Sequence, residues 1–145
     1  MRLLIQRVSA CKCIIDGAIH SSINEGFLVY VAFESGDTNL TIDKAILKIQ
    51  KLRIFTDSND KLNLSINDIK GDVIIISSFS LFADLNTGNR PSFSRSLSFN
   101  LSKPLYDYMI EKASIELNAK SGVFGADMKI ESINDGPISV IYDLS

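Results

Sequence analysis

The chain has 145 residues, of which 46% are hydrophobic and 22% are charged. This length and balance suit one globular domain with a core of its own. The formal net charge of −2 excludes a protein that coats nucleic acid through bulk electrostatics, although a local basic patch would still permit contact with one end of an RNA.

Targeting and membrane segments are not expected. The first apolar run ends at Gln6 and Arg7, well short of a signal peptide, and no apolar run approaches the ~18 residues of a membrane span. Cys11 and Cys13 occupy one strand-like run, in which their side chains would lie parallel, a poor geometry for a disulfide. We therefore expect a single domain over residues 1–145, with reduced thiols, in the cytoplasm.

In chain order, the apolar pattern predicts strands at 2–8, 11–15, 18–23, 26–33, 53–55, 73–80, 127–133 and 138–142, and an irregular edge segment at 61–65. Asp16-Gly17 is a two-residue hairpin signal between the second and third of these. The run at 26–33 is apolar throughout, which is typical of a strand buried on both faces.

Two helices complete the prediction. Asp37-Thr38 cap the first, and apolar residues follow at helical spacing over 40–52. Ser102 caps the second, with Pro104 in its first turn and an apolar face over 105–117. Because the strands outnumber the helices and do not alternate with them, we expect an α+β domain. Its mainly antiparallel, barrel-like sheet carries the two helices on one side.

Side-chain catalysis finds little support in the sequence. Ser77, Ser78 and Ser80 end the strongest predicted strand, but a serine nucleophile needs an adjacent base, and His20, the only histidine, falls on a predicted surface hairpin. No nucleophile elbow, phosphate loop or dinucleotide fingerprint is present. The spacing of Asp84, Asp127 and Asp135 matches no metal or glycosidase pattern, so we expect neither a metal nor a cofactor.

The end of the chain carries a backbone signal instead. Gly136-Pro137 stands between two alternating apolar runs. Other atoms can approach glycine closely, and proline is the one residue before which a cis peptide costs little. Taken alone, a Gly-Pro step is an ordinary tight turn. The mix of basic and aromatic residues at 90–95 is, by itself, equally consistent with a solvated loop anchored by Phe93.

Eight segments carry a wider resemblance, namely 5–8, 36–38, 51–55, 60–65, 77–84, 88–93, 122–128 and 134–137. Their order and spacing, across nearly the whole chain, resemble the D-aminoacyl-tRNA deacylase family in its bacterial and eukaryotic form. The stretches Gly-Val-Phe-Gly-Ala-Asp-Met at 122–128 and Asn-Asp-Gly-Pro at 134–137 are the most specific.

The resemblance implies a function in chiral proofreading. The family hydrolyses the ester between a D-amino acid and the terminal adenosine of tRNA, which frees the tRNA. Its members are homodimers whose active sites lie at the subunit interface, where they take the 3′ acceptor end of aminoacyl-tRNA. In the family the Gly-Pro peptide is cis, and its carbonyls reach into the partner's pocket.

The resemblance also assigns roles to residues of this chain. The catalytic set is Ser77, Ser78, Phe79 and Ser80. The substrate-binding set is Arg7, Phe93, Met128, Gly136 and Pro137, in which Arg7 braces the Gly-Pro carbonyls and Phe93 lies near the adenosine.

The expected mechanism needs no histidine. A backbone N–H near Phe79 would stabilise the oxyanion, and the ribose 2′-OH of the substrate would assist the attacking water. The Gly-Pro carbonyls would capture the α-amino group, an L side chain would collide with the wall, and a D side chain would point outward. Glycine has no side chain to reject, so some activity on glycyl-tRNA is expected.

Two departures from the family pattern leave alternatives open. The common Ser-Gln-Phe-Thr-Leu reads Ser77-Ser78-Phe79-Ser80-Leu81 here, and the basic Lys-Gly-Arg-Arg-Pro loop reads Thr87-Gly88-Asn89-Arg90-Pro91. Fewer cations predict weaker tRNA binding with a shallower salt dependence. The alternatives are a hydrolase that forms an acyl-enzyme on Ser80, a catalytically weakened dimer that binds the tRNA 3′ end, and a purely structural α+β dimer.

Overall fold

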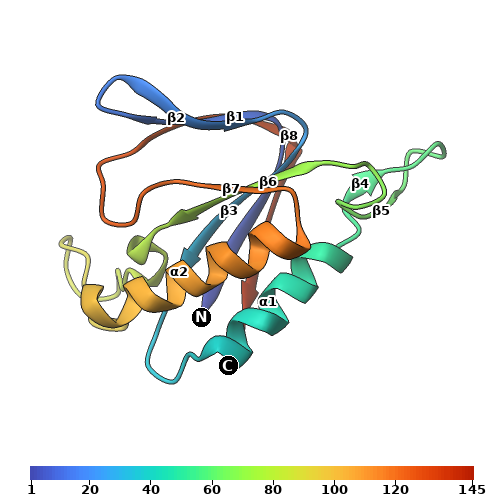
Figure 1. Ribbon diagram of the computed structural model, residues 1–145. Coiled ribbons are helices and arrows are strands. Elements are labelled where there is room, and N and C mark those ends of the chain that lie inside the picture. Colours follow the sequence, from blue (N-terminus) through green and yellow to red (C-terminus); the bar gives the residue numbers. More distant parts are fainter.

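A computed structural model describes residues 1–145 and shows a curved sheet with two helices against one face (Figure 1). The elements, in chain order, are β1 (Arg2–Ile15), β2 (Ala18–Ile23), β3 (Gly26–Ala32), α1 (Asn39–Lys51), β4 (Phe55–Thr56), β5 (Leu62–Leu64), β6 (Asp72–Ser77), the 3₁₀ turn η1 (Phe79–Phe82), α2 (Phe99–Glu116), β7 (Ala119–Ser121) and β8 (Lys129–Asp143). Neither helix combines the length and apolar character needed to cross a membrane.

The main sheet has six strands, with β2, β1, β3, β6 and β7 in that order and β8 paired to β1. β1 is shared along its length: residues 2–8 pair with β3, residues 11–15 pair with β2, and β8 runs antiparallel to both halves. Only the pairs β3–β6 and β6–β7 are parallel.

The two ends of the sheet curl toward each other. The Ser21 hydroxyl donates to the Ser121 carbonyl at 2.8 Å, and Lys120 Nζ donates to the Ser22 carbonyl at 2.8 Å. These contacts join β2 to β7 and nearly close a barrel. The expected α+β class, with a mainly antiparallel, barrel-like sheet and two helices on one side, is confirmed.

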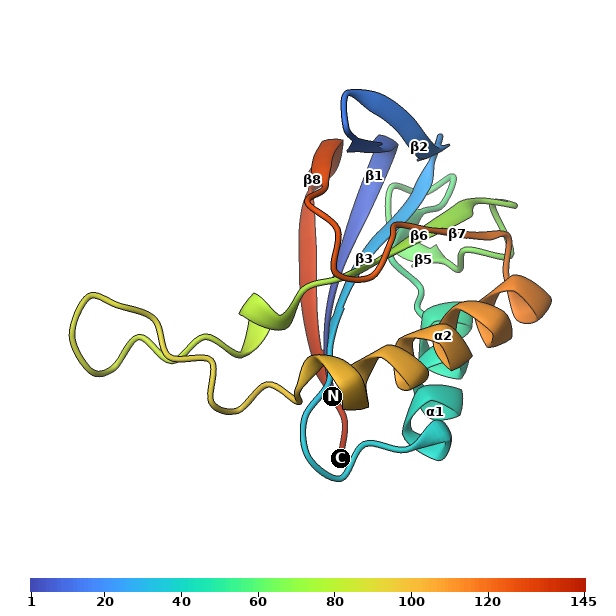
Figure 2. The same ribbon diagram turned by 60° about the vertical axis from the view of Figure 1, so that its left-hand side comes forward.

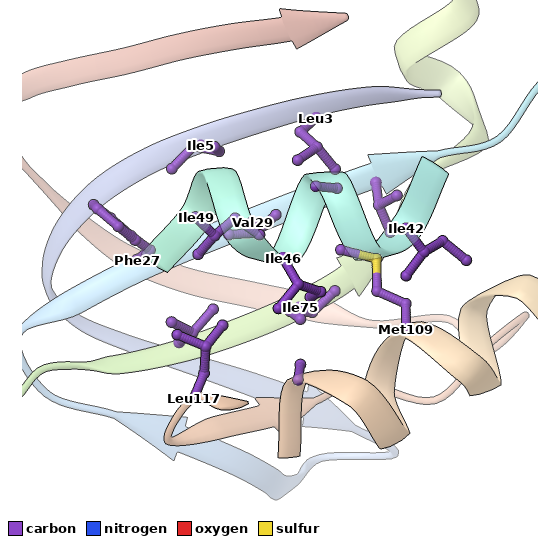
Figure 3. Close-up of a cluster of buried hydrophobic side chains, with 14 of the residues drawn as sticks. Leu3, Ile5, Phe27, Val29, Ile42, Ile46, Ile49, Ile75, Met109 and Leu117 are labelled. Carbon is purple, nitrogen blue, oxygen red and sulfur yellow. The ribbon is translucent and has the colours of Figure 1, made fainter. Parts of the chain in front are cut away.

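Two apolar clusters lie on opposite faces of the sheet. The larger has 21 buried residues and fills the space between the sheet and the helices, where Ile46 and Ile49 of α1 meet Val29 of β3 (Figure 3). The smaller has seven buried residues inside the barrel, including Leu28 and Cys13. Because β3 contributes to both clusters, the continuous apolar run predicted to be buried on both faces is confirmed.

The helices are fixed to each other by polar contacts as well. Gln50 Nε2 donates to the Glu116 carbonyl at 3.0 Å, and the Tyr108 hydroxyl donates to Asp43 Oδ1 at 2.9 Å. Between η1 and α2, by contrast, the chain leaves this body and extends away from it (Figure 2). That excursion begins and ends next to the cavity described below.

Several predicted boundaries were wrong. Residues 2–8 and 11–15 form one strand, β1. Residues 129–133 and 138–142 belong to one strand, β8. Both breaks are bridged because β1 and β8 pair with each other on either side of them, with irregularities between Gln6 and Ala10. The short strand predicted at 53–55 starts at Phe55, and β7 was not predicted at all.

The second helix begins earlier than predicted. Ser98, and not Ser102, precedes its first turn, since the Leu101 and Ser102 amides both donate to the Ser98 carbonyl. Pro104 therefore lies inside the helix. The Ser102 hydroxyl donates to the Leu97 carbonyl at 3.1 Å, which ties the start of α2 to the residues that line the cavity.

Candidate active site

A cavity of about 570 Å³ opens where β6 ends and η1 begins. Six of the nine residues expected in the site line it, namely Ser77, Ser78, Phe79, Ser80, Phe93 and Met128. The other lining residues are Val31, Ala32, Phe33, Ser96, Leu97, Phe99, Ser102, Phe124, Gly125 and Ala126. Phe124, Gly125 and Ala126 belong to the 122–128 stretch that carried the family resemblance, so that motif was the signal for them.

The predicted strand 73–80 ends at Ser77, and its last residues form the 3₁₀ turn η1. The Ser78 amide donates to the Val31 carbonyl at 2.8 Å, and the first bond of the turn runs from the Leu81 amide to the Ser78 carbonyl at 3.2 Å. The Phe79 and Ser80 amides precede that bond. They occupy the position at which a helical turn leaves its N–H groups without a partner inside the turn.

The polar part of the cavity consists of hydroxyl and backbone groups. Ser78 Oγ and Ser80 Oγ lie 2.9 Å apart and share one hydrogen bond. None of the 16 lining residues carries a titratable side chain. His20 lies exposed on β2, and Asp84, Asp127 and Asp135 do not line the cavity either. Within one chain, the cavity thus offers no imidazole or carboxylate as a general base.

Aromatic rings form the walls. Phe79 and Phe93 meet edge to face, with ring centroids 5.0 Å apart and an interplanar angle of 78°. Phe79 is 60% exposed and Phe93 is 38% exposed, so this pair forms an open rim. On another wall, the rings of Phe99 and Phe124 also pack edge to face at 5.0 Å. Met128 packs against the cluster inside the barrel.

A short segment, the loop base (residues 93–97), holds Phe93 in place. Arg95 donates two hydrogen bonds, of 2.7 and 3.2 Å, to the Glu34 carboxylate. Its guanidinium lies 4.5 Å from the centre of the Phe82 ring. The Leu97 amide donates to the Phe33 carbonyl at 2.8 Å. Arg95, part of the basic and aromatic stretch noted in the sequence, is therefore engaged in a salt bridge within the chain.

The remaining three expected residues lie elsewhere, around β8. Gln6 pairs with Ser139 and Val8 with Asn134, so that Arg7 alone faces residues 135–138, which we call the Gly-Pro bulge. The Gly136-Pro137 peptide is cis, as the resemblance implied, and both residues are exposed.

Arg7 fastens this bulge to the body. It is 9% exposed, and its Nε donates to the Asp135 carbonyl at 3.0 Å. Its Nη1 donates to the Ile54 carbonyl at 3.0 Å and to Thr56 Oγ1 at 3.2 Å. The carbonyl that Arg7 reaches is thus the one directly before Gly136. A second brace closes the bulge, because Asn134 Oδ1 accepts a hydrogen bond of 3.1 Å from the Ile138 amide.

Gly136 is required by its backbone and by its surroundings. Its φ of +135° is rare for residues with a side chain. A methyl group at this position would lie 2.8 Å from Ile138 Cγ1 and 3.3 Å from Arg7 Nη2. The structure therefore contains two separate groups of expected site residues, the cavity and the Gly-Pro bulge. Arg7, Gly136 and Pro137 do not line the cavity of their own chain.

The stability that the loop base gains from Glu34 depends on pH. The hydrogen bond from Arg95 is the largest cause that lowers the pKa of Glu34, and the N-terminal ammonium, which donates to Glu34 at 3.2 Å, adds to it. The Glu34 carboxylate takes up a proton more readily in the unfolded state than in the folded state. Its contribution to stability is therefore complete above the ordinary pKa of 4.5. It is lost as the pH falls through the lowered value.

We predict that Glu34→Gln destabilises the protein at pH 7 and that its difference from the wild type shrinks as the pH falls below the ordinary pKa of 4.5 and through the lowered value. Urea unfolding of both proteins across this range measures the difference. Glu25→Gln, at an exposed carboxylate outside the network, is the control and should change stability little at any pH. A difference between wild type and Glu34→Gln that stays constant with pH would contradict the assignment.

Comparison with known proteins agrees with this geometry. The family described as D-Tyr-tRNA(Tyr) deacylase matches residues 4–143. The chain is 44% identical over 144 residues to the D-aminoacyl-tRNA deacylase of Finegoldia magna, which covers 99% of this chain and 97% of the relative.

Two solved structures share the fold. The c-Myc DNA Unwinding Element Binding Protein has a TM-score of 0.94 at 26% identity, over 100% of this chain and 99% of that one. A probable eukaryotic D-amino acid tRNA deacylase has a TM-score of 0.88 at 16% identity, over 99% and 98% of the two chains. On the evidence of the family match and the Finegoldia magna relative, the chain belongs to the D-Tyr-tRNA(Tyr) deacylase family.

Proposed function

We propose that this protein hydrolyses the ester bond of D-aminoacyl-tRNA, consuming one water and releasing the D-amino acid and free tRNA. The observation that carries the proposal, beside family membership, is the character of the cavity. Its volume of about 570 Å³ suits an aminoacylated nucleoside, yet no lining residue is titratable. Such a site fits a substrate that is already reactive, since an activated ester needs positioning and oxyanion stabilisation more than a strong base.

In the proposed mechanism, the start of η1 acts on the scissile carbonyl. The Phe79 and Ser80 amides precede the first bond of the turn, and one of them donates to the developing oxyanion. The attacking water is assisted by the ribose 2′-OH of the substrate, which supplies the proton acceptor that the cavity lacks. The aromatic rim of Phe79 and Phe93 receives the terminal adenosine by stacking.

Enantiomer selection is assigned to the Gly-Pro bulge of a second subunit. The bulge is exposed, rigidly braced by Arg7 and Asn134, and separate from the cavity of its own chain. In a homodimer, its carbonyls enter the partner's cavity and capture the α-amino group of the substrate. An L side chain is then excluded by collision, whereas a D side chain points outward.

Exposed apolar side chains support such a dimer. Ile133 and Ile141 on β8 are 62% and 67% exposed, and Phe99 beside the cavity is 57% exposed. Apolar surface of this kind on both the bulge strand and the cavity rim is typical of a subunit interface. β8 pairs with β1 alone, so its other edge is free.

In this proposal, the part of the tRNA outside the cavity is bound weakly. Arg95 is occupied by Glu34, which leaves Arg90 as the exposed cation of the loop between η1 and α2. Affinity for tRNA should therefore fall only gently with added salt. The free, buried Cys11 and Cys13 suit a reducing compartment such as the cytoplasm, where tRNA is charged.

The purified protein should release D-tyrosine from D-tyrosyl-tRNA much faster than L-tyrosine from L-tyrosyl-tRNA, with no effect of a chelator. It should also release some glycine from glycyl-tRNA, because steric exclusion has no side chain to act on. Single-turnover kinetics on the three substrates measure this. Binding of tRNA without hydrolysis would instead favour a non-catalytic binder of the tRNA end, and inactivity on glycyl-tRNA alone would contradict exclusion by collision.

Ser80→Ala should retain most of the activity, with a loss of no more than about threefold, because the chemistry is assigned to backbone and substrate groups. An acyl-enzyme formed on Ser80 would instead require its hydroxyl, and the variant would lose nearly all activity. Ser80 is exposed, and its hydroxyl bonds only to that of Ser78, so the variant should fold normally. Single-turnover rates on D-tyrosyl-tRNA separate the two mechanisms.

A further inference from the structure

The Ser96 hydroxyl donates a hydrogen bond of 2.7 Å to the Phe79 carbonyl. Ser96 lines the same cavity as Phe79 and is partly buried. The two residues lie 17 positions apart, so this contact joins the loop base to η1 across the cavity wall. Neither the family resemblance nor the proposed mechanism gives Ser96 a role.

The donor is held on a fixed support. The Ser96 amide donates to the Phe93 carbonyl at 3.0 Å, and Ser96 forms an isolated β-bridge with Glu34, just beyond the end of β3. The neighbouring residues are anchored as well, through the Arg95–Glu34 ion pair and the bond from the Leu97 amide to the Phe33 carbonyl. Although the chain between η1 and α2 extends from the body (Figure 2), the contacts of Ser96 and Leu97 with residues 33 and 34 fix this part of it to the body.

The Phe79 carbonyl that accepts this hydrogen bond belongs to the same peptide group as the Ser80 N–H. A peptide group is planar, and in the trans form its C=O and N–H point in opposite directions. A bond that fixes the Phe79 carbonyl therefore also fixes the direction of the Ser80 N–H. That N–H precedes the first hydrogen bond of η1, and Ser80 is one of the residues that line the cavity.

We propose that Ser96 is a positioning residue for the hydrolysis: its hydroxyl orients the Phe79–Ser80 peptide so that the Ser80 N–H is aimed at the oxyanion. This rests on the proposed function, in which an amide of this turn stabilises the transition state. A donor set in place before the reaction costs no reorganisation when charge develops, so loosening it lowers the rate of the chemical step more than it weakens substrate binding.

The test compares three variants on D-tyrosyl-tRNA under single-turnover and steady-state conditions. Ser96→Ala should lower kcat by about tenfold, below the loss for removing a donor outright, and leave KM within about twofold. Ser96→Thr keeps the hydroxyl and suits the extended backbone of the bridge, so it should restore most of kcat. Ser94→Ala is the matched control, because Ser94 lies in the same segment outside the cavity, and it should behave like the wild type.

Amide NMR resonances test the positioning apart from catalysis. The Phe79 and Ser80 resonances should move in Ser96→Ala and stay in place in Ser94→Ala and Ser96→Thr. If the wild type does not hydrolyse D-tyrosyl-tRNA, the proposed function fails, and these resonances alone decide whether Ser96 orients the turn. Unchanged resonances, a normal kcat for Ser96→Ala, or a loss that appears only in KM would each overturn the proposal.

Discussion

A buried guanidinium fixes the most unusual part of this fold. Arg7, alone opposite four residues of β8, holds the Asp135 carbonyl on one side and the Ile54 carbonyl and Thr56 hydroxyl on the other. A charge so placed must be paired and hydrogen-bonded, because an unmatched one would cost several kcal/mol. The bulge that carries Gly136 and Pro137 therefore projects from the sheet as a rigid segment. It is exposed on the surface and is held in place by hydrogen bonds from the buried Arg7 side chain.

The cavity and the bulge complement each other chemically. The cavity offers hydroxyls, aromatic rings and the free amides at the start of η1, but nothing ionisable that would bind an α-amino group. The bulge offers exposed backbone carbonyls that do not reach the cavity of their own chain. The two chains of the proposed dimer would each supply the other with the missing half of its site. Such an arrangement would allow selection by handedness and ester hydrolysis without a titratable side chain in the cavity.

Much of the fold was predictable, and the failures have physical causes. β2, β3 and α1 with its Thr38 cap followed from local patterns that their environment reinforces. The strand predicted through Ser80 stops at Ser77 because its pairing with β3 ends at Val31, and no local pattern reveals where a partner strand ends. The second helix was predicted to start at Ser102, but it starts after Ser98. The Leu97 amide bonds to the Phe33 carbonyl and the Ser102 hydroxyl bonds to the Leu97 carbonyl there, and no local pattern reveals these contacts. Six of the expected site residues gather at one cavity, whereas Ser96 depends on a contact between distant segments that no motif announces.

The central claim is that each active site combines the cavity of one chain with the bulge of another, and mixed dimers test it most directly. Gly136→Ala should distort the bulge, and Ser80→Trp should block the cavity from an exposed position. Each variant alone should fail to hydrolyse D-tyrosyl-tRNA. After the two are unfolded and refolded together, half of the dimers should be mixed, each with one intact site, and about a quarter of wild-type activity should return. Mixed dimers that form without any recovery, or a Gly136→Ala protein that remains fully active and selective, would contradict the account.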